Sequence, residues 1–477
     1  MPFAITQLLV GSSARDYSLA GPESRRARER GLVDGDWFRS PVDPERMREL
    51  TERSNGRAIR DLAIWLTLLV ATGAAAAVAY GRWWAVPVFV LYGALYAGAA
   101  DARWHEFGHG TASASNRLND VVYVFASFLL WRNPTAWRWS HFRHHSDTII
   151  VGRDPEIQLG RPARLRHFVL NFTLLVNGPR SIATLVRYAT GRLDAETRDY
   201  VPIAEQRRLV IEARAFVALY LGVICVAIAT TSWLPVLLVG LPTVYGAWLM
   251  VFFGATQHLG LREDVLDHRY TTRTVMMNPV FRFLYLNMNY HVEHHMFPNV
   301  PYHRLPELHA EIADTLPPPS PSTWHAYREI VGALWRQRRD PDHEVPRNVP
   351  TVVGPDVSGV RLGAVRPDGA FDLGPIGLVE LGTVSRVDVG DHTYAVARTA
   401  PDTVCVVDGY CTHGRAHLAD GTIVDGPGGP QIECPKHNGR FDLASGAPCR
   451  RPATIDLTVH AVSIDDGHAI IEQEASA

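Results

Sequence analysis

Long apolar runs interrupt the polar pattern of the first half of the chain, and they come in two pairs. Residues 62–80 and 83–100 are separated by two residues, and residues 215–231 and 233–256 by one. Each run has 17 to 24 residues, a length that matches the roughly 30 Å hydrocarbon core of a bilayer when the run is helical. The pattern predicts four membrane-spanning helices in two hairpins. Four buried core helices are the alternative.

Arginines predict which side of the membrane the polar segments occupy. They gather before the first and third runs, at Arg46, Arg48, Arg53, Arg57, Arg60, Arg207, Arg208 and Arg214. The connecting hairpins carry only Arg82. Because basic residues favour the cytoplasmic side, we expect the N-terminus, the middle segment and everything after residue 256 to be cytoplasmic. The N-terminal stretch lacks a basic region followed by a sufficient apolar run, so no signal peptide is expected.

The remaining pattern divides the chain further. Residues 121–131 and 168–176 are apolar but too short to span, and we expect them to lie along the membrane interface as amphipathic helices. A helical pattern over residues 324–338 precedes a Pro/Gly-rich stretch. From residue 375, short alternating runs such as "HTYAVAR" predict a small all-β domain. The expected parts are a cytoplasmic segment 1–60, a membrane domain 61–339, a flexible linker 340–374 and a β domain 375–477.

Composition excludes several classes of function. The 47 basic residues nearly balance the 49 acidic ones, which gives no reason to expect a nucleic-acid partner. Five cysteines in 477 residues do not make a disulfide scaffold. Since no Gly-rich strand–turn–helix pattern for FAD or NAD occurs, any electrons from a nicotinamide cofactor require a separate protein.

Histidines form three clusters beside the apolar runs. They are "HEFGH" (His105, His109), "HFRHH" (His141, His144, His145) and "HVEHH" (His291, His294, His295), and a further histidine, His258, follows the fourth run. On a helix, positions i, i+3 and i+4 share one face, so each cluster directs its imidazoles to one side. Two H-x-x-H-H motifs arise by chance in roughly one chain in a thousand. Nine imidazoles on one membrane surface suit two ions of intermediate softness, such as iron.

Other polar residues near the clusters receive simpler interpretations. His167, His268, His303 and His309 have no partner spacing and are not expected to bind metal. The glutamates within the clusters, at positions 106 and 293, point to neighbouring helix faces, and we expect them to hold imidazoles or solvent.

The clusters, their order and their place after paired hairpins resemble the membrane fatty-acid desaturase and hydroxylase superfamily across residues 60–310. The sequence "HHMFPNVPYHRLPELH" extends the resemblance beyond the last cluster. The resemblance implies a non-haem di-iron centre in an all-helical cytoplasmic cap above four spans. Its implied ligands are His105, His109, His141, His144, His145, His291, His294 and His295, with His258, outside any cluster, as the ninth.

The C-terminal part contains a second metal pattern. "CTHG" and "CPKHNG" place Cys411 with His413 and Cys434 with His437. Two thiolates on one iron and two imidazoles on the other are the ligands of a Rieske [2Fe–2S] cluster, and a zinc site is the alternative. Residues 378–472 resemble the Rieske ferredoxin family. Some Rieske proteins have a disulfide between the two ligand loops. At the matching positions this chain has Ala416 and Lys436, so it resembles the ferredoxin type without that bridge.

These resemblances together imply an O2-dependent membrane oxygenase, a desaturase or hydroxylase that attacks an unactivated C–H bond of a fatty-acyl or lipid-like substrate. The Rieske domain would deliver electrons received from a separate NAD(P)H-dependent reductase, at the cytoplasmic face of a bacterial membrane. One alternative is a hydroxylase or O-demethylase of a small polar metabolite, resembling the rhizopine-catabolism oxygenase. A Rieske-type ring oxygenase fits less well, since its catalytic domain follows the Rieske domain. A membrane-tethered electron carrier with structural zinc is the non-enzymatic alternative.

Overall fold

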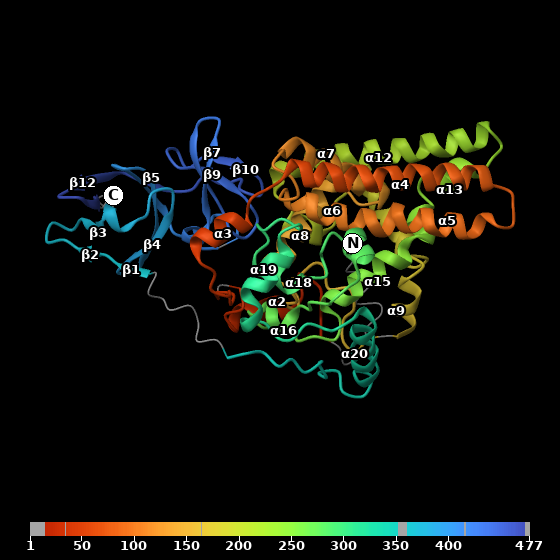
Figure 1. Ribbon diagram of the computed structural model, residues 1–477, viewed down its shortest axis with the longest axis horizontal. Helices are drawn as coiled ribbons and strands as arrows, with labels where there is room; N and C mark the ends of the chain where they lie inside the picture. Colours follow the sequence, from red (N-terminus) through yellow and green to blue (C-terminus); the bar gives the residue numbers. More distant parts are fainter. Residues whose placement is uncertain (1–14, 34, 164, 352–359, 415, 473–477) are drawn as a thin grey trace. The chain divides into compact units, whose positions relative to one another are not determined.

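A computed structural model describes residues 15–33, 35–163, 165–351, 360–414 and 416–472. Tertiary contacts divide the chain into two compact units. One unit is helical, and the other is formed mainly by the chain from residue 351 onward, which is built of β-strands (Figure 1). The expected fold class is therefore confirmed. The interpretation of the first 14 residues, and that of positions 352–359 in the expected linker, fall outside the described residues.

The helices of the first unit succeed one another along the chain. Their bounds are α2 (Pro22–Glu29), α4 (Asn55–Ala79), α5 (Ala85–Gly93), the π-helix η1 (Ala94–Gly98), α6 (Ala99–His109), α7 (Asn116–Leu129), α8 (Pro134–Ser146), α9 (Leu165–Asn171), α10 (Asn177–Ala189), α11 (Ala195–Tyr200), α12 (Ile203–Ala229), α13 (Leu234–Leu238), α14 (Pro242–Tyr245), α15 (Ala247–His258), α16 (His268–Thr271), α17 (Pro279–Leu284), α18 (His291–Met296), α19 (Leu305–Ile312), the 3-10 helix η2 (Ala313–Thr315) and α20 (Thr323–Arg336).

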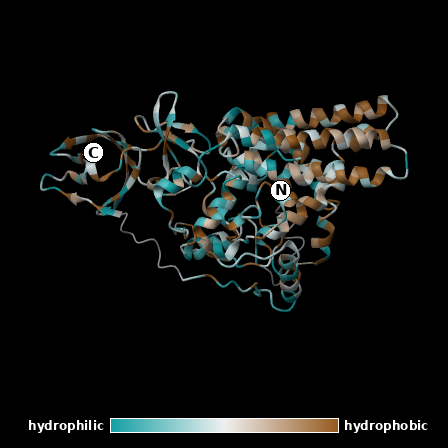
Figure 2. Cartoon of the chain, viewed as in Figure 1, coloured by the Kyte–Doolittle hydropathy of each residue, from teal (hydrophilic) through white to brown (hydrophobic). Residues whose placement is uncertain are grey.

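Three helical stretches within the described residues are long and apolar enough to cross a membrane: Pro44–Ala79, Ala85–His109 and Ile203–Ala229. In the apolar 18-residue segment of each stretch, only 22% of the first and 17% of the third is buried. Val78 on α4, for example, is 74% exposed. The ribbons of α4 and α12 are largely brown, the colour of hydrophobic residues, in Figure 2. Since buried core helices would hide such side chains, their exposure is consistent with a membrane protein in which lipid covers these helices.

The fourth apolar run does not form a single helix. It is divided into α13, α14 and α15, with Gly240 between the first two at a φ of +97°. That left-handed conformation favours glycine, and Pro242, at the start of α14, cannot donate the backbone hydrogen bond that a continuous helix needs. Four spans are therefore not confirmed and remain a prediction.

A close backbone approach fixes α15 against the second span. A Cβ atom added to Gly246 would lie 1.9 Å from the carbonyl oxygen of Gly93, and one added to Gly98 would lie 2.6 Å from Cβ of Leu249. These small residues let α15 pack directly on η1, and α14 on α5. Because η1 continues into α6, the contact holds the ends of α6 and α15 near each other.

The shorter apolar patches are helical in part: residues 121–129 lie in α7 and residues 168–171 in α9, whereas residues 172–176 form turns. Residues 121–131 lie mostly in α7, where Val121 is exposed and its neighbours Val122 and Tyr123 are buried. Residues 168–176 begin in α9, where Phe168 is buried and the next residue is exposed. Both segments are amphipathic, and their position at a membrane interface stays a prediction.

The second unit contains α3 (Pro44–Leu50) and three sheets. Their orders are β1-β4-β5-β6-β11, β10-β9-β8-β7 and β12-β13-β3-β2. The strands are β1 (Val360–Leu362), β2 (Ala364–Val365), β3 (Phe371–Pro375), β4 (Val384–Val389), β5 (His392–Ala400), β6 (Thr403–Asp408), β7 (Thr422–Gly426), β8 (Gly429–Glu433), β9 (Arg440–Asp442), β10 (Pro448–Arg450), β11 (Val459–His460), β12 (Val462–Asp465) and β13 (His468–Ile471).

The strands of this unit begin earlier than the sequence interpretation placed them. Strands β1 and β2 and most of β3 fall within residues 340–374, which were expected to be a flexible linker, so the β domain begins before residue 375. The segment "GPGGP" closes the β7–β8 hairpin, in which Gly426 pairs with Gly429. Strands of two to five residues are too short to give a clear alternating pattern.

Candidate metal centres

Four elements of the helical unit carry the nine predicted histidines. We call the three clusters, in chain order, box one (His105, His109), box two (His141, His144, His145) and box three (His291, His294, His295). Box one lies on α6, box two on α8 and box three on α18, and His258 is the last residue of α15. Helix α8 starts at a fixed point, because the Asn133 side chain accepts a hydrogen bond from the Ala136 N–H and Pro134 occupies the first turn. The start of α8 therefore sets the side of the helix from which the imidazoles of box two project.

The structure brings all nine histidines into two adjoining groups. In the first group the potential ligand atoms lie within 4.8 Å of one another, and its members are His105, His109, His141, His145 and His294. In the second group, His144, His258 and His295, the potential ligand atoms also lie within 4.8 Å of one another. His291 adjoins it, because its Nε2 lies 3.1 Å from Nε2 of both His258 and His295. Each group combines histidines from different elements.

Outer polar groups orient several of these rings. Nδ1 of His141 lies 3.0 Å from Glu156, Nδ1 of His144 lies 2.8 Å from Asp154, and Nδ1 of His258 lies 2.9 Å from the Thr271 carbonyl oxygen. When Nδ1–H donates to an outer acceptor, Nε2 is left as the metal-binding atom. This arrangement is typical of imidazoles that hold a metal ion.

One buried carboxylate connects box one with box three. Glu106 is fully buried, and its Oε1 lies 3.6 Å from Nδ1 of His105 and 3.7 Å from Nδ1 of His294. Its other oxygen accepts the backbone N–H of Tyr302. The expectation that Glu106 faces imidazoles agrees with this geometry. Glu293 instead accepts hydrogen bonds from Thr274 and His309.

The donor set fits two metal ions. Nε2 of His105 and Nε2 of His294 are buried, and neither has a hydrogen-bond partner in the described part of the chain. Buried polar atoms are nearly always satisfied, so these two nitrogens point to a missing ligand. Nε2 of His109 also faces Nε2 of His141 at 3.0 Å. An ion between such nitrogens would satisfy them together.

Burial also keeps most of the imidazoles outside the spanning helices neutral, as a metal ligand must be. Desolvation lowers the pKa well below the ordinary value of 6.5 at His141, His145, His258, His291, His294 and His295. His144 differs. Burial alone would lower its pKa, but the charge and hydrogen bond of Asp154 outweigh that effect and raise it.

The second candidate centre lies in two loops of the β unit. Cys411 and His413 follow β6, whereas Cys434 and His437 separate β8 from β9. Both cysteines are buried, and the two imidazole rings lie 4.8 Å apart at an interplanar angle of 83°. The four predicted residues are therefore brought together in two pairs. None of the five cysteines forms a disulfide within the described residues.

Backbone amides line the sulfur side of this centre. The N–H groups of His413 and Gly414 donate to Cys411, and those of Lys436 and His437 donate to Cys434. The hydrogen bond with Cys411 lowers the pKa of Cys434, and the backbone donors lower it further. Donors of this kind stabilise thiolates and tune the potential of an iron–sulfur cluster. The loop geometry therefore fits a [2Fe–2S] cluster.

Sequence reasoning missed part of the surroundings. His268 is buried and stacks on Trp37 with ring centroids 4.2 Å apart, and its ring centroid lies 5.2 Å from that of His295. The acceptors Asp154 and Glu156 come from the segment "GRDPE" after box two. Two acidic residues close behind a histidine cluster are a signal that could have identified them.

Comparisons with known proteins match both parts of the chain. The fatty acid desaturase family model matches residues 81–327, and the Rieske [2Fe-2S] domain model matches residues 371–461. Ferredoxin CarAc of Metapseudomonas resinovorans is 37% identical over 20% of this chain and 83% of that protein. The ferredoxin component of the 2,4-dinitrotoluene dioxygenase system of Burkholderia sp. (strain RASC) is 35% identical over 17% of this chain and 72% of that protein. The solved structure of the Sphingomonas yanoikuyae B1 ferredoxin is 36% identical, with a TM-score of 0.20 and coverage of 22% and 97%.

Proposed function

The chain belongs to the fatty acid desaturase family and carries a Rieske [2Fe-2S] domain, and from this premise we propose that it is an O2-dependent di-iron oxygenase that attacks an unactivated C–H bond. The convergence of nine histidines in two adjoining groups is the observation that carries the proposal. The outcome of the reaction is a double bond or an alcohol, because both begin with removal of hydrogen from carbon.

The proposed ligands follow the two groups. One iron is held by members of the five-histidine group, and the other by His144, His258, His291 and His295. When bound, the iron pair supplies O2 activation, which no side chain can provide. The protein's own residues hold most of the ligands neutral, orient several of their Nε2 atoms and keep the five-histidine group out of bulk water.

The fused Rieske domain is the proposed electron donor. Its proposed ligands are Cys411, His413, Cys434 and His437. Tethering a donor to its acceptor replaces a bimolecular encounter by an intramolecular one, with an effective concentration that reaches the millimolar range for short flexible linkers. Its relatives include ferredoxin components of dioxygenase systems. We therefore propose that a separate NAD(P)H-dependent reductase reduces this domain.

The proposed setting is a bacterial cytoplasmic membrane. Three apolar helical stretches support it, and the fourth span would be completed by the interrupted segment α13 to α15. The arginines beside the spans support a cytoplasmic position for the N-terminus, the histidine groups and the Rieske domain.

Two substrate classes are compatible with this chemistry. A fatty-acyl or lipid-like chain is favoured by the family and by the apolar helices. A small polar metabolite, subject to hydroxylation or O-demethylation, is the second class, and the glutamines in the wall of a cavity of mixed polarity beside the second histidine group are compatible with it. A non-catalytic electron carrier with structural zinc is the remaining alternative, and metal analysis distinguishes it.

Mass analysis of the products tests the proposed reaction. The purified chain receives a ferredoxin reductase, NADH, O2 and a panel of acyl and polar candidate substrates. Desaturation removes about 2 Da, hydroxylation adds about 16 Da and O-demethylation removes about 14 Da. A substrate-dependent shift that requires O2 supports the oxygenase. If the iron-loaded, reduced chain changes no candidate and consumes no O2, the proposal fails.

A further inference from the structure

Helix α20 presents apolar side chains on two opposite faces. Its buried face is made of Ala326, Ile330, Ala333 and Leu334. On the other face, Trp324 is 75% exposed, Val331 46% and Trp335 58%. Because these three residues are separated by seven and four positions, they form one stripe along the helix. Packing inside the helical unit accounts for the first face only, and an exposed stripe with two tryptophans indicates an interaction surface.

The buried face fixes α20 against α15, whose last residue is His258. The Tyr327 hydroxyl donates to the Phe252 carbonyl oxygen at 2.7 Å, and the two rings stack with centroids 5.0 Å apart. Leu334 belongs to a buried apolar cluster that also contains Phe168 of α9. Helix α20 therefore lies where the fourth apolar run ends, and beside α9, a segment expected at the membrane interface.

Exposed apolar side chains also occur on the elements packed around α15. Val169 on α9 and Val280 on α17 are each 64% exposed. Phe281 on α17 contacts the Phe252 ring on α15, with centroids 5.8 Å apart. Figure 1 shows α20 running across the direction of the long helices α4 and α12. Spanning helices cross the bilayer, whereas interfacial amphipathic helices lie along its surface, so this direction is that of an interfacial helix.

Arginines flank the stripe. Residues 323–340 contain two acidic residues against four exposed arginines, Arg328, Arg336, Arg338 and Arg339. One of the acidic side chains, Glu329, is turned toward Arg273, 3.4 Å away. Anionic lipids of the cytoplasmic leaflet attract basic segments, and tryptophans favour the boundary between headgroups and acyl chains. An anionic lipid surface complements both features, whereas a purely apolar partner would leave the arginines without counter-charges.

From the stripe, its neighbours and its charge, we propose that the outer face of α20 docks on the anionic lipid surface of the cytoplasmic leaflet. Trp324, Val331 and Trp335 enter the boundary between headgroups and acyl chains, and the arginines contact lipid phosphates. The proposal rests on the proposed membrane setting and goes beyond the proposed reaction.

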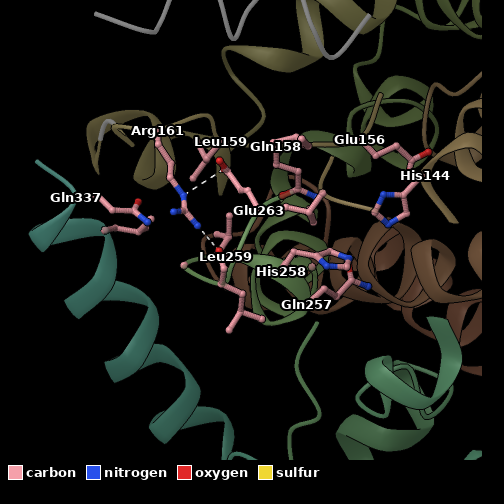
Figure 3. A pocket seen from close by; sticks show the side chains of 16 residues that line it. His144, Glu156, Gln158, Leu159, Arg161, Gln257, His258, Leu259, Glu263 and Gln337 are labelled. Carbon is pink, nitrogen blue, oxygen red and sulfur yellow. Dashed lines mark hydrogen bonds and ion pairs between the residues drawn. The ribbon is translucent and has the colours of Figure 1, made fainter. Parts of the chain in front are cut away.

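Docking of α20 has a consequence for the second histidine group. Leu334 and Gln337 of its buried side line a cavity whose wall also includes His144 and His258. Figure 3 shows Gln337 at one end of this cavity and His144 at the other. A helix with its side chains is about 10–12 Å across. The lipid surface on one face of α20 and the cavity on the other are therefore separated by about one helix diameter.

Collisions of a nitroxide label with O2, which concentrates in lipid, and with a neutral nickel chelate, which stays in water, test the proposal. The label is placed at Val331→Cys in the full-length chain, in which the exposed cysteines are replaced by Cys225→Ser and Cys449→Ser. Nanodiscs of phosphatidylcholine, with or without phosphatidylglycerol, hold the protein. Val78→Cys on α4 is the lipid reference and Glu29→Cys on α2 the water reference, since both side chains are exposed.

We expect nickel collisions at Val331 to fall clearly below those at Glu29, and O2 collisions to approach those at Val78. The Rieske absorption spectrum and the helical circular dichroism confirm that each labelled chain is folded. Trp324→Cys provides a second label position on the stripe if the label at Val331 disturbs the fold.

The lipid charge tests the arginines. Phosphatidylglycerol should lower nickel collisions at Val331 further than phosphatidylcholine alone. The triple variant Arg336→Gln/Arg338→Gln/Arg339→Gln should lose this effect. It should be retained in a control with the same net charge, altered on α2 at Arg25→Gln/Arg26→Gln/Arg28→Gln.

Three results would overturn the proposal. One is nickel access at Val331 equal to that at Glu29 while Val78 is protected. Another is protection that grows with protein concentration in detergent and is absent in nanodiscs holding one chain, which would assign the stripe to a second copy. The third is a phosphatidylglycerol effect that is absent, or that the α20 triple variant retains. If Val78 is as accessible to nickel as Glu29, the membrane setting itself fails and the proposal with it, whereas O2 consumption with reductase and NADH tests the reaction independently.

Discussion

Asp154 provides the sharpest test of the second histidine group. It is fully buried, and its Oδ2 accepts hydrogen bonds from Nδ1 of His144 and from the Ile149 N–H, both at 2.8 Å. Its Oδ1 accepts the Glu156 N–H at 2.7 Å. An asparagine has one oxygen and one NH2 group, so in either orientation its NH2 group opposes at least one of these donors. Asp154→Asn therefore removes the negative charge beside the His144 ring and opposes either the Glu156 N–H or both other donors, without changing the size of the side chain.

The expected magnitude follows from the role of such outer groups. Loss of a carboxylate that orients a ligand imidazole lowers metal affinity by about 10- to 100-fold, which corresponds to about 1.4 to 2.7 kcal/mol. The assay is competition between the purified chain and a calibrated iron chelator, with iron measured against acid-labile sulfide. Because the Rieske cluster supplies all the sulfide, it serves as an internal standard for protein amount and folding.

A matched control comes from the same region. Asp147 is also buried, but it pairs with Arg143 and Arg153 and contacts no proposed ligand. We expect Asp147→Asn to retain the iron affinity of the unmodified chain. If Asp154→Asn also retains it, the assignment of His144 as an oriented iron ligand is refuted. If both variants lose iron equally, the effect belongs to local folding and not to the ligand.

Three further predictions concern separate parts of the molecule. His294→Ala should abolish turnover while the Rieske absorption spectrum stays intact, because His294 is proposed to bind only the di-iron centre; retained turnover would remove it from the ligand set. Cys411→Ser should eliminate the Rieske spectrum and NADH-driven turnover but leave about two irons per chain, and loss of all iron would show that the two centres are not independent. Gly246→Ala should lower the stability by about 1–3 kcal/mol, because its Cβ would overlap the Gly93 carbonyl oxygen. Thermal unfolding measures this loss against Gly222→Ala, where an added Cβ meets nothing within 4 Å and the change should be neutral or stabilising.

The histidine groups could be predicted because their signal is local. Spacing of three and four residues on a helix places imidazoles on one face, as seen for His291, His294 and His295 on α18. His258 has no such spacing, and only its place after an apolar run indicated it. The structure brings it to His291 through α15, whose position depends on the tight Gly93–Gly246 contact.

Features that depend on distant or weak signals were not predicted. The acceptor Asp154 reaches His144 from a loop, and Thr271 reaches His258 from the four-residue helix α16, which is too short to give a helical pattern. The interruption at Gly240 was hidden because residues 233–256 are apolar throughout, and hydropathy does not report backbone conformation. Strand β2 has two residues, too few for an alternating pattern to mark where the β domain begins.

The pairing of a di-iron centre with a Rieske cluster explains why one chain combines these two units. O2 activation at two irons consumes two electrons from outside, whereas a [2Fe–2S] cluster transfers them one at a time. A covalent link keeps the donor available for the second transfer. On the proposed function, an external reductase then supplies the electrons to the Rieske domain.

Counting metals in the purified full-length chain tests this account most directly. Elemental analysis of iron and zinc is combined with an assay of acid-labile sulfide on the same sample. A di-iron centre together with one Rieske cluster predicts about four irons, about two sulfides and no stoichiometric zinc per chain. About two irons and two sulfides with zinc in the histidine groups would contradict it, because zinc cannot change oxidation state to activate O2.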